Sequence, residues 1–365
     1  MNRIFTIVLY IAATLFVAGC AKSESVGPNA AYQRYFDAWI SINHPQAEPT
    51  GLGIYIIDEN EGDGIEVKDN GFVLLDYITT DLEGNISNYT DATTSKQLGE
   101  YSITNYYGPK FLTTVKTTLP AGLANAIVGS KVGTYREVII PSWLMSYKSY
   151  DSEKDYLNPP LEKDESYDAS SFSNTIYRFT IKDYTENIND WQVDSIGRFF
   201  KNNEVRIDGK PASEVFVKEN GISMTAADST SLGFYYKQIK APENTEEFAK
   251  DTTVYINYVG KLLNGLVFDT NIERVAKDNG LYSLSATYKP ARINWGESES
   301  EITMGDDKSS IIAGFAKTLW QMKAMEKGVG VFYSDWGYGY NGTGASIPGY
   351  ATLIFEIELV AKPEE

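Results

Sequence analysis

Apolar side chains recur at every second position in two long stretches of the chain, and a period of two is typical of β-strands. In the first stretch the pattern predicts strands at 54–56, 73–77, 135–140 and 175–181. In the second stretch it predicts strands at 233–239, 254–258, 329–332 and 352–359. Before its penultimate strand, each stretch also holds one short helical pattern, at 123–128 and at 313–325.

The two stretches are similar in sequence as well as in pattern. Leu52-Gly53-Ile54-Tyr55 parallels Leu232-Gly233-Phe234-Tyr235, and Asp76-Tyr77 with a later Leu and Gly parallels Asn257-Tyr258 with a later Leu and Gly. This period is far longer than that of a solenoid repeat, so it indicates two copies of one domain. The order of strands, one helix and further strands predicts the α+β class, with a curved antiparallel sheet wrapped on one short helix in each copy.

Helical patterns also lie outside the two copies. Aromatic residues from Tyr32 to Trp39 recur at helical spacing, and the helix that they predict ends before Pro45. A second helical pattern at 187–203 predicts a helical linker between the copies. The predicted organisation is therefore a leader, a tether with the N-terminal helix, the first copy, the linker and the second copy: 1–19, 20–50, 51–185, 186–203 and 204–365.

The N-terminal segment predicts export. Arg3 gives a short positive start, an apolar stretch of signal-peptide length follows, and the sequence then reads Val17-Ala18-Gly19-Cys20. This arrangement resembles a bacterial lipobox, in which a signal peptidase cuts before Cys20 and the thiol carries the lipid. We therefore expect a lipid anchor at Cys20 and a location at the cell envelope. The alternative is an ordinary signal peptide with a chance cysteine.

Composition excludes several kinds of chemistry. The chain carries 49 acidic and 32 basic side chains, a net charge of −17, which disfavours nucleic acid as a partner. One histidine, His44, and one cysteine are too few for a His/Cys zinc site, a Cys–His dyad or a disulfide framework. His44 lies in an Asn-His-Pro turn, where we interpret it as a surface residue. We expect no metal site.

Five motifs follow one another in the second copy: 254–260 (VYINYVG), 264–269 (NGLVFD), 311–315 (IIAGF), 334–339 (SDWGYG), and 347–348 (IP) with 351–359 (ATLIFEIEL). In this order they resemble the FKBP-type peptidyl-prolyl cis-trans isomerases, over residues 232–362. Residues 52–183 resemble the same family more loosely. The resemblance implies two tandem FKBP-like domains, an isomerase activity without a cofactor, and a site that binds a prolyl ring.

Position by position, the resemblance also implies roles for individual side chains. Phe268, Asp269 and Tyr338 are the expected catalytic residues. The expected substrate-binding residues line the same site: Tyr258, Arg274, Ile311, Ile312, Phe315, Ile347 and Phe355. Arg274 falls where the family often has an arginine that pairs with the aspartate. The span 275–300 is longer than is usual in the family and is expected to form a flap over the site.

The first copy keeps the skeleton and loses the site residues. Counting from Gly84 places Ser87-Asn88 where the second copy has Phe268-Asp269, and Ser146-Tyr147 where it has Tyr338-Gly339. Val115 and Leu119 are expected to keep part of an apolar floor. We interpret this copy as a degenerate domain used for packing or binding. The alternative is a working site that uses Tyr89 and Tyr147.

The leading hypothesis is a monomeric prolyl isomerase, tethered by lipid, that assists the folding of envelope proteins. Its expected partners are proline-containing or unfolded polypeptides and, through the anchor, the membrane. A second hypothesis is a non-enzymatic FKBP-like binding protein or chaperone. A third is surface glycan binding, because Tyr and Trp side chains stack on sugars.

Overall fold

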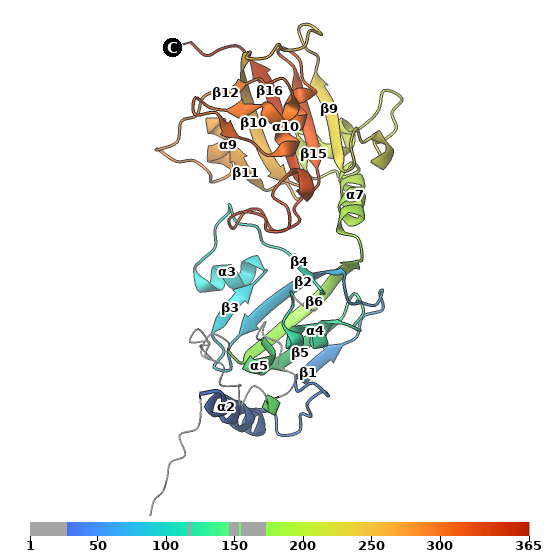
Figure 1. The fold of residues 1–365 in the computed structure, drawn as a ribbon, viewed down its shortest axis with the longest axis vertical. Coiled ribbons are helices and arrows are strands. Elements are labelled where there is room, and N and C mark those ends of the chain that lie inside the picture. The colour runs from blue at the N-terminus through green and yellow to red at the C-terminus, as the bar shows by residue number, and fades with distance from the viewer. Residues whose placement is uncertain (1–27, 116–117, 146–152, 155–172, 365) are drawn as a thin grey trace, which may run out of the picture.

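The computed structural model describes residues 28–115, 118–145, 153–154 and 173–364, which form two antiparallel sheets with few helices (Figure 1). The first sheet lies at one end of an elongated molecule and the second at the other. The helix α7 (Ile188–Phe199) connects them along one side. The expected fold class, two tandem copies joined by a helical linker, is confirmed.

The first sheet has the strand order β1-β5-β6-β2-β3, with β4 also paired to β2. Its strands are β1 (Tyr55–Asn60), β2 (Phe72–Thr80), β3 (Ile86–Tyr89), β4 (Lys110–Thr113), β5 (Tyr135–Ile140) and β6 (Thr175–Thr185). Its helices are α2 (Pro28–Asn43), α3 (Ala92–Leu98), α4 (Ala121–Ile127) and α5 (Ser142–Met145). Side chains of α4 pack with one face of this sheet in a single buried cluster.

The second sheet has the strand order β9-β15-β16-β10-β12-β13-β14, with β11 also paired to β10. Its strands are β9 (Phe234–Lys240), β10 (Thr253–Leu262), β11 (Val267–Thr270), β12 (Ala291–Asn294), β13 (Thr303–Met304), β14 (Ser309–Ser310), β15 (Lys327–Phe332) and β16 (Leu353–Val360). The accompanying helices are α9 (Glu273–Asp278) and α10 (Ala313–Trp320), and short 3₁₀ turns lie at Glu299–Glu301 and Ser334–Trp336.

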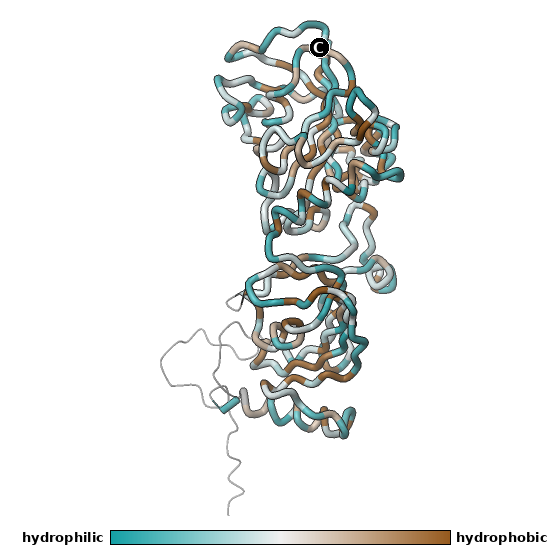
Figure 2. The backbone as a smooth tube through the Cα atoms, turned by 90° about the vertical axis from the view of Figure 1, so that its right-hand side faces the viewer, coloured by the Kyte–Doolittle hydropathy of each residue, from teal (hydrophilic) through white to brown (hydrophobic). Residues whose placement is uncertain are grey.

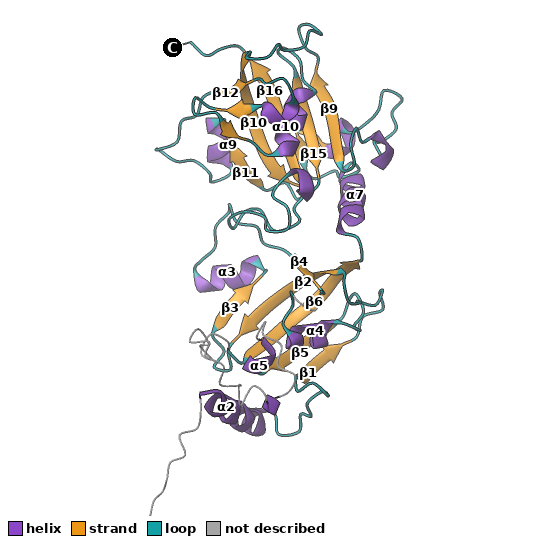
Figure 3. Ribbon diagram, in the orientation of Figure 1, coloured by secondary structure: helices purple, strands orange, loops and turns teal. Residues whose placement is uncertain are grey.

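Between the linker helix and the second sheet lies a small module of short elements: β7 (Arg206–Ile207), β8 (Lys210–Pro211), α8 (Ala212–Val215) and a 3₁₀ turn at Ala226–Asp228. Apolar side chains of this module join those of α7 in one buried cluster with the second sheet. The second sheet is therefore covered on both faces, by α10 on one side and by α7 with the small module on the other (Figure 3).

Alternation along the strands explains the two covered faces. Phe332 and Phe234 point into the cluster under α10, whereas their neighbours Val331 and Tyr235 point into the cluster under α7. The first sheet uses the same arrangement, because Val138 and Ile140 face α4 while Ile139 contacts the cluster of α2. The apolar stretches of both sheets are visible along the backbone in Figure 2.

The two sheets have the same connectivity. Strands β1, β5, β6, β2, β3 and β4 of the first occupy the places of β9, β15, β16, β10, β11 and β12 of the second. Even an irregularity is shared: the pairing of β2 with β3 shifts register after Thr79, and that of β10 with β11 shifts after Gly260. The internal repeat predicted from the sequence is therefore a repeat of the fold.

Two expectations differ from the structure, and three lie outside the described residues. The helix expected at 313–325 ends at Trp320, because the chain turns there to enter β15. The span 275–300 was expected to form a flap, but it includes the end of α9 and the strand β12, which pairs with β10. The expected leader 1–19, the lipid site Cys20 and the pair Ser146-Tyr147 lie outside the described residues.

Candidate active site

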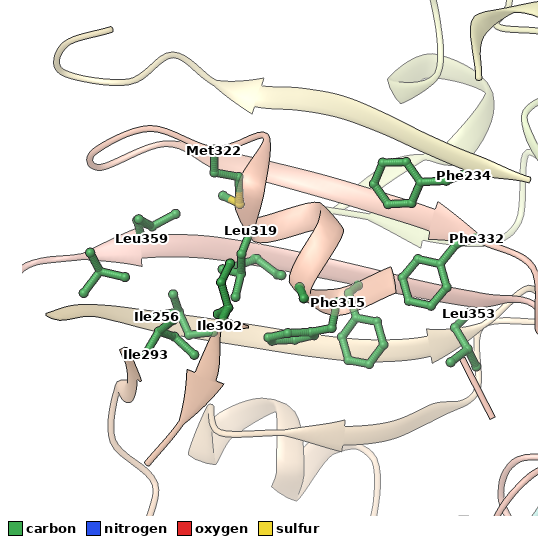
Figure 4. Close-up of a cluster of buried hydrophobic side chains, with 14 of the residues drawn as sticks. Phe234, Ile256, Ile293, Ile302, Phe315, Leu319, Met322, Phe332, Leu353 and Leu359 are labelled. Carbon is green, nitrogen blue, oxygen red and sulfur yellow. The ribbon is translucent and has the colours of Figure 1, made fainter. Parts of the chain in front are cut away.

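The expected site residues converge where β10, β11 and β16 lie side by side beneath α10. Gly260 on the central strand β10 pairs with Asp269 on one side and with Phe355 on the other. From above, α10 directs Phe315 onto the sheet, next to the buried side chains Leu319 and Phe332 (Figure 4). Residues from four separate motifs therefore meet at one position of the sheet.

Aromatic rings form the floor of this site. Phe315 and Phe355 meet edge to face, with ring centroids 4.8 Å apart, and Phe268 meets Phe355 in the same way at 5.6 Å. Tyr258 stands with its edge against Phe315, at a centroid distance of 5.6 Å. Edge-to-face pairs of this kind hold each ring in a defined orientation. We call Tyr258, Phe268, Phe315 and Phe355 the aromatic site.

A glycine makes room for these rings. A β-carbon at Gly260 would lie 2.6 Å from the ring of Phe268 and 2.9 Å from the ring of Phe355. Both distances are shorter than real contacts allow, so any larger residue would displace the rings. The backbone of β10 is thus the base against which Phe268 and Phe355 pack.

The three expected isoleucines extend the apolar surface. Ile347 is 3% exposed and belongs to the same buried cluster as Phe315 and Phe355. Ile311 and Ile312 are half-buried and pack against that cluster just before the first turn of α10. The floor is therefore buried while the isoleucine pair and Phe268 remain partly open to solvent, which leaves apolar atoms available to a ligand.

The polar edge of the site consists of Tyr258 and Asp269. The Tyr258 hydroxyl donates a hydrogen bond of 3.0 Å to Oδ2 of Asp269. Desolvation by the surrounding protein raises the pKa of Asp269, although the hydrogen bond from Tyr258 acts in the opposite direction. Desolvation and the charge of Asp269 together raise the pKa of Tyr258, so the phenol keeps its proton and remains a donor.

Hydrogen bonds to the main chain of Tyr258 hold the Tyr258–Asp269 pair in place. Thr270 donates from its hydroxyl to the carbonyl of Tyr258 at 2.7 Å, and the amide of Tyr258 donates to the side-chain oxygen of Asn271 at 2.8 Å. These two bonds tie β11 to β10 beside the catalytic candidates. The orientation of Asp269 is therefore set by the sheet rather than by a flexible loop.

Tyr338 lies on the loop that follows the 3₁₀ turn and is 37% exposed. Partial burial raises its pKa, and the nearby charge of Asp269 adds to the effect. Gly339 follows in a left-handed conformation with φ of +60°, and its amide donates to the carbonyl of Ser334 at 2.9 Å. The turn thus places a protonated hydroxyl near the carboxylate, with part of its surface open to solvent.

The expected pairing of Arg274 with Asp269 is wrong. Its side chain is 91% exposed and lies 3.7 Å from Asp278, one helical turn further along α9. The sequence spacing gave no sign that a helix begins at Glu273 and turns this side chain outward. Asp269 has Tyr258 as its hydrogen-bonding partner instead.

Sequence reasoning also missed the residues that hold the loop bearing Tyr338. The buried amide of Ser334 donates to Oε1 of Gln192 on the linker helix at 2.7 Å, and Asn189 of the same helix donates to Asp335 at 2.9 Å. The amide of Tyr106, in the first copy, donates to the carbonyl of Ala345 at 2.8 Å. Contacts between positions so far apart leave no local pattern, so only the structure reveals them.

Within the described residues, no group of three or more His, Cys, Asp or Glu side chains is close enough to hold a metal ion. In that same part of the chain, no helix is long and apolar enough to cross a membrane. What the site offers is an aromatic surface edged by a carboxylate and two phenols. Such a surface can surround a small apolar ring and donate or accept hydrogen bonds at its rim.

At the corresponding place the first copy has a different set of side chains. Register pairs Thr79 with Asn88 and with Tyr177, as it pairs Gly260 with Asp269 and with Phe355. Ser87 stands where Phe268 stands, and its hydroxyl lies 2.8 Å from that of Thr79. The expected pair Ser87-Asn88 is therefore in the expected place. The alternative residue Tyr89 points elsewhere, since its hydroxyl donates to Glu100 at 2.9 Å.

The floor of the first copy also differs from expectation. Pro120 caps α4 as Ile312 caps α10, so Leu119 and Leu123 take the places of Ile311 and Phe315. Leu119 is buried in the core of that copy, as expected, and Leu123 rather than Val115 supplies the centre of the floor.

Comparison with known proteins agrees with this geometry. Residues 244–360 match the family model described as FKBP-type peptidyl-prolyl cis-trans isomerase. The FK506-binding protein 1A of Aspergillus fumigatus is 31% identical over 125 residues, which are 34% of this chain and 90% of that protein. The FKBP-type 22 kDa peptidyl-prolyl cis-trans isomerase of Escherichia coli is 27% identical over 155 residues, 42% of this chain and 62% of that protein.

A solved structure of the three FKBP domains of wheat FKBP73 aligns with 85% of this chain and 95% of its own at 15% identity, with a TM-score of 0.26. That score is too low to compare how the domains are arranged. The match to the Aspergillus fumigatus protein carries more weight, because this chain covers 90% of that protein at 31% identity. The chain belongs to the family of FKBP-type peptidyl-prolyl cis-trans isomerases.

Proposed function

We propose that the second copy catalyses the cis–trans isomerisation of X–Pro bonds and that the chain assists protein folding at the cell envelope. The observation that carries the catalytic part is the Tyr258–Asp269 hydrogen bond at the open edge of the aromatic site. It places a carboxylate and a phenol beside an apolar surface formed by Phe268, Phe315 and Phe355. In a polypeptide, a proline residue combines an apolar ring, which the aromatic surface can surround, with an adjoining polar amide, which the carboxylate and the phenol can contact.

The chemistry requires no covalent step. Resonance gives the X–Pro amide its planarity and places negative charge on its oxygen, and rotation faces a barrier of about 18–20 kcal/mol. Twisting the bond removes that resonance and reduces the charge separation. A dehydrated apolar site therefore disfavours the planar amide more than the twisted one, which lowers the barrier between them.

The polar residues have separate proposed roles. Tyr338 donates a hydrogen bond to a carbonyl of the bound peptide, since its raised pKa keeps the phenol protonated. Asp269 orients the twisted amide and holds the Tyr258 ring in place through their hydrogen bond. Phe268, Phe315 and Phe355 surround the proline ring, while Ile311, Ile312 and Ile347 extend the apolar surface around it.

An isomerisation assay on a short proline peptide tests the catalytic proposal. The full chain is compared with Asp269→Ala and Tyr338→Phe, and circular dichroism establishes that both variants are folded. We expect catalysis by the full chain and a lower kcat/KM for both variants. Equal rates for all three chains would remove Asp269 and Tyr338 from the mechanism. A rate for the unaltered chain no higher than the uncatalysed one would remove the activity.

The envelope part of the proposal depends on Cys20. A lipobox-like sequence before this residue supports cleavage there and attachment of lipid to the thiol. Expression in a bacterium with labelled palmitate, followed by membrane fractionation, tests it with Cys20→Ser as the comparison. We expect the label and the membrane association to be present in the unaltered chain and absent in the variant. A labelled Cys20→Ser chain would contradict the assignment.

A second candidate function is non-enzymatic binding of unfolded proteins. It is favoured by the first copy, which keeps the fold but has Ser87 and Asn88 at the positions of Phe268 and Asp269. The distinguishing measurement is the aggregation of an unfolded test protein in the presence of the Asp269→Ala chain. Undiminished suppression of aggregation by this variant would show a binding function that does not require the isomerase site.

A further inference from the structure

Exposed apolar side chains gather on three loops, and one of these loops comes from the first copy. We name them the first-copy loop (residues 99–109), the second-copy loop (residues 280–290) and the closing loop (residues 337–350). The first two follow α3 and α9 at corresponding places of the repeated fold. The closing loop carries Tyr338.

The first-copy and second-copy loops have the same internal architecture. Tyr101 stacks on Tyr107 in the first, and Tyr282 stacks on Tyr288 in the second, with nearly equal ring distances of 5.3 and 5.4 Å and the same interplanar angle of 15°. In each loop the second tyrosine hydroxyl accepts a hydrogen bond from the amide of the serine after the first tyrosine. In each loop a helix lysine also lies over the first tyrosine ring. Both loops are thus braced by the same set of contacts.

The braced loops present an apolar side chain at corresponding positions, Ile103 in one and Leu284 in the other. Ile103 lies against the second copy, where a β-carbon at Gly280 would be only 2.5 Å from its methyl group. Leu284 is 92% exposed. One exposed apolar side chain needs no explanation, but a group of them on neighbouring loops is typical of an interaction site. The contact of Ile103 with Gly280 shows that an apolar side chain at this loop position can pack against a main chain that has no side chain in the way.

Two contacts join the three loops into one surface. Ile103 connects the first-copy loop to the start of the second-copy loop at Gly280, and the amide of Tyr106 connects it to the closing loop at Ala345. In Figure 1 the first-copy loop and the closing loop lie between the two sheets, and the second-copy loop leaves α9 on the same side and extends outward beside the second sheet. The exposed apolar side chains of these loops are Tyr101, Ile103, Tyr282, Leu284, Tyr338 and Tyr340.

We propose that these loops form a polypeptide-binding surface that holds an apolar segment of an unfolded chain while its prolyl bond occupies the aromatic site. This proposal rests on the isomerase function proposed above, because Tyr338 belongs both to the surface and to the site. It gives the degenerate first copy a role, since the first-copy loop supplies one part of the surface. The substrate class is an unfolded protein with apolar residues near its proline.

Charge decides between an unfolded polypeptide and a second copy of the same chain. Each chain carries a net charge of −17, so two copies repel each other on approach. Lys96 and Lys277 lie over the tyrosine rings of the two braced loops, but the charge of Lys277 is already paired with Glu273 at 2.6 Å. An uncharged apolar segment of an unfolded polypeptide fits this surface without the repulsion that two acidic chains would meet. The bracing also reduces the ordering that the loops must undergo when a segment binds.

The test uses two substrates and four variants of the full chain. A short proline peptide reports on the aromatic site alone, while the proline-limited refolding of an unfolded protein also reports on the surface. The surface variants are Leu284→Ser and Ile103→Ser. The matched controls are Ile222→Ser, whose side chain is 58% exposed against 56% for Ile103, and Leu232→Ser, whose side chain is 66% exposed.

We expect Leu284→Ser to lower kcat/KM for the unfolded protein about tenfold, the effect of losing one buried leucine contact, and to leave the short peptide unaffected. Ile103→Ser is expected to act in the same direction, and both controls are expected to match the unaltered chain. Unchanged refolding rates for both surface variants, with normal activity on the peptide, would overturn this proposal alone. Absence of activity on the peptide in the unaltered chain would overturn the isomerase function instead. A Leu284-dependent dimer in sedimentation would also overturn it, because a second copy would then occupy the surface.

Discussion

The two copies share a sheet and differ at one position of it. Where β10 has Gly260, against which the rings of Phe268 and Phe355 pack, β2 has Thr79, whose side chain occupies that space. In the first copy the neighbouring hydroxyl of Ser87 bonds to Thr79 instead of an aromatic ring resting there. The comparison teaches that a site can disappear through side chains that fill it, while strands, register and even the bulge beside it persist.

Both copies retain the glycine at which their helix approaches the sheet, so the packing of helix on sheet is constrained separately from the site residues. A β-carbon at Gly122 of α4 would lie 2.4 Å from Ile140, and one at Gly314 of α10 would lie 2.4 Å from Phe332. Both helices therefore need glycine at the same place to approach their sheets. The residue that follows is Leu123 in one copy and Phe315 in the other. Packing of helix on sheet is preserved, and the aromatic floor is not.

The largest expected effect comes from making the second copy resemble the first at the central strand. Gly260→Thr places a branched side chain within 3 Å of the rings of Phe268 and Phe355, so both must move. We expect kcat/KM for the short peptide to fall by at least about a hundredfold, and the free energy of unfolding to fall by about 1–3 kcal/mol. The isomerisation assay and urea denaturation measure the two effects.

Gly51→Thr is the matched control for this variant, because nothing lies within 4 Å of a β-carbon there. It should keep both the activity and the stability of the unaltered chain. If Gly260→Thr retained full activity, the rings of Phe268 and Phe355 would not be part of the site, and the filling of the first copy by Thr79 would not explain its difference.

A smaller effect is expected when the carboxylate alone is replaced as in the first copy. Asp269→Asn introduces the amide that Asn88 has at the corresponding position. It removes the negative charge that accepts the hydrogen bond from Tyr258. We expect kcat/KM for the short peptide to fall about tenfold, the worth of a hydrogen bond to a charged group. An unchanged rate would assign Asp269 a structural role only.

The difference in stability between the unaltered chain and this variant is expected to depend on pH. Desolvation raises the pKa of Asp269 in the folded chain, so its contribution to stability is fully present below the unfolded pKa and is lost as the pH rises through the folded pKa. Asp269→Asn avoids that loss. Its free energy of unfolding should exceed that of the unaltered chain at pH 7, and the advantage should shrink as the pH approaches about 3.9. An advantage that grows on acidification would contradict the sign of the shift.

An effect of intermediate to small size is expected at the contact between the copies. Tyr350, at the end of the closing loop, meets Phe72 edge to face at 5.4 Å and Phe111 at 6.0 Å, and its φ is +61°. The rings of the first copy thus hold a tyrosine in the left-handed region, which costs free energy. Tyr350→Ala should lower kcat for the short peptide about threefold, because the loop that carries Tyr338 loses part of its support.

Tyr350→Phe is the control for this prediction, since it keeps the ring and removes only the hydroxyl. Its kcat should equal that of the unaltered chain. A kcat unchanged in Tyr350→Ala would show that the hydrogen bonds from Gln192 and Asn189 hold the loop without help from the first copy.

Much of this fold was predictable because its signals are local. The period of two located the strands, and motif order located Phe268, Asp269, Phe315 and Phe355, which the structure brings together. Counting from Gly84 located Ser87-Asn88 in the first copy, and register places them there. The features that could not be predicted depend on contacts between segments far apart in the chain, and such contacts leave no periodic pattern in the sequence.

Arg274 and Tyr106 illustrate what sequence could not give. Five residues after Asp269, Arg274 occupies the expected position in sequence, yet the helix α9 directs it to Asp278 and to solvent. Tyr106 bonds to Ala345 across the contact between the copies, and burial raises its pKa to about 12. No sequence motif links Tyr106 to Ala345, and only the folded chain shows that the first copy contacts the closing loop of the second copy.

The smallest expected effect is that of rebuilding the site in the first copy. Thr79→Gly, Ser87→Phe and Asn88→Asp together, introduced into a chain whose second site is inactivated by Gly260→Thr, restore the strand side of the site. We expect no more than about a twofold gain over the uncatalysed rate, because Leu123 still stands where the second copy has Phe315, and the contact of a flat ring with the proline is missing. A gain of tenfold or more would contradict this, and would mean that filling of the strand alone separates the two copies. A gain that appears only when Leu123→Phe is added would show that the helix floor and the strand act together, so that the loss of the site in the first copy required changes on both.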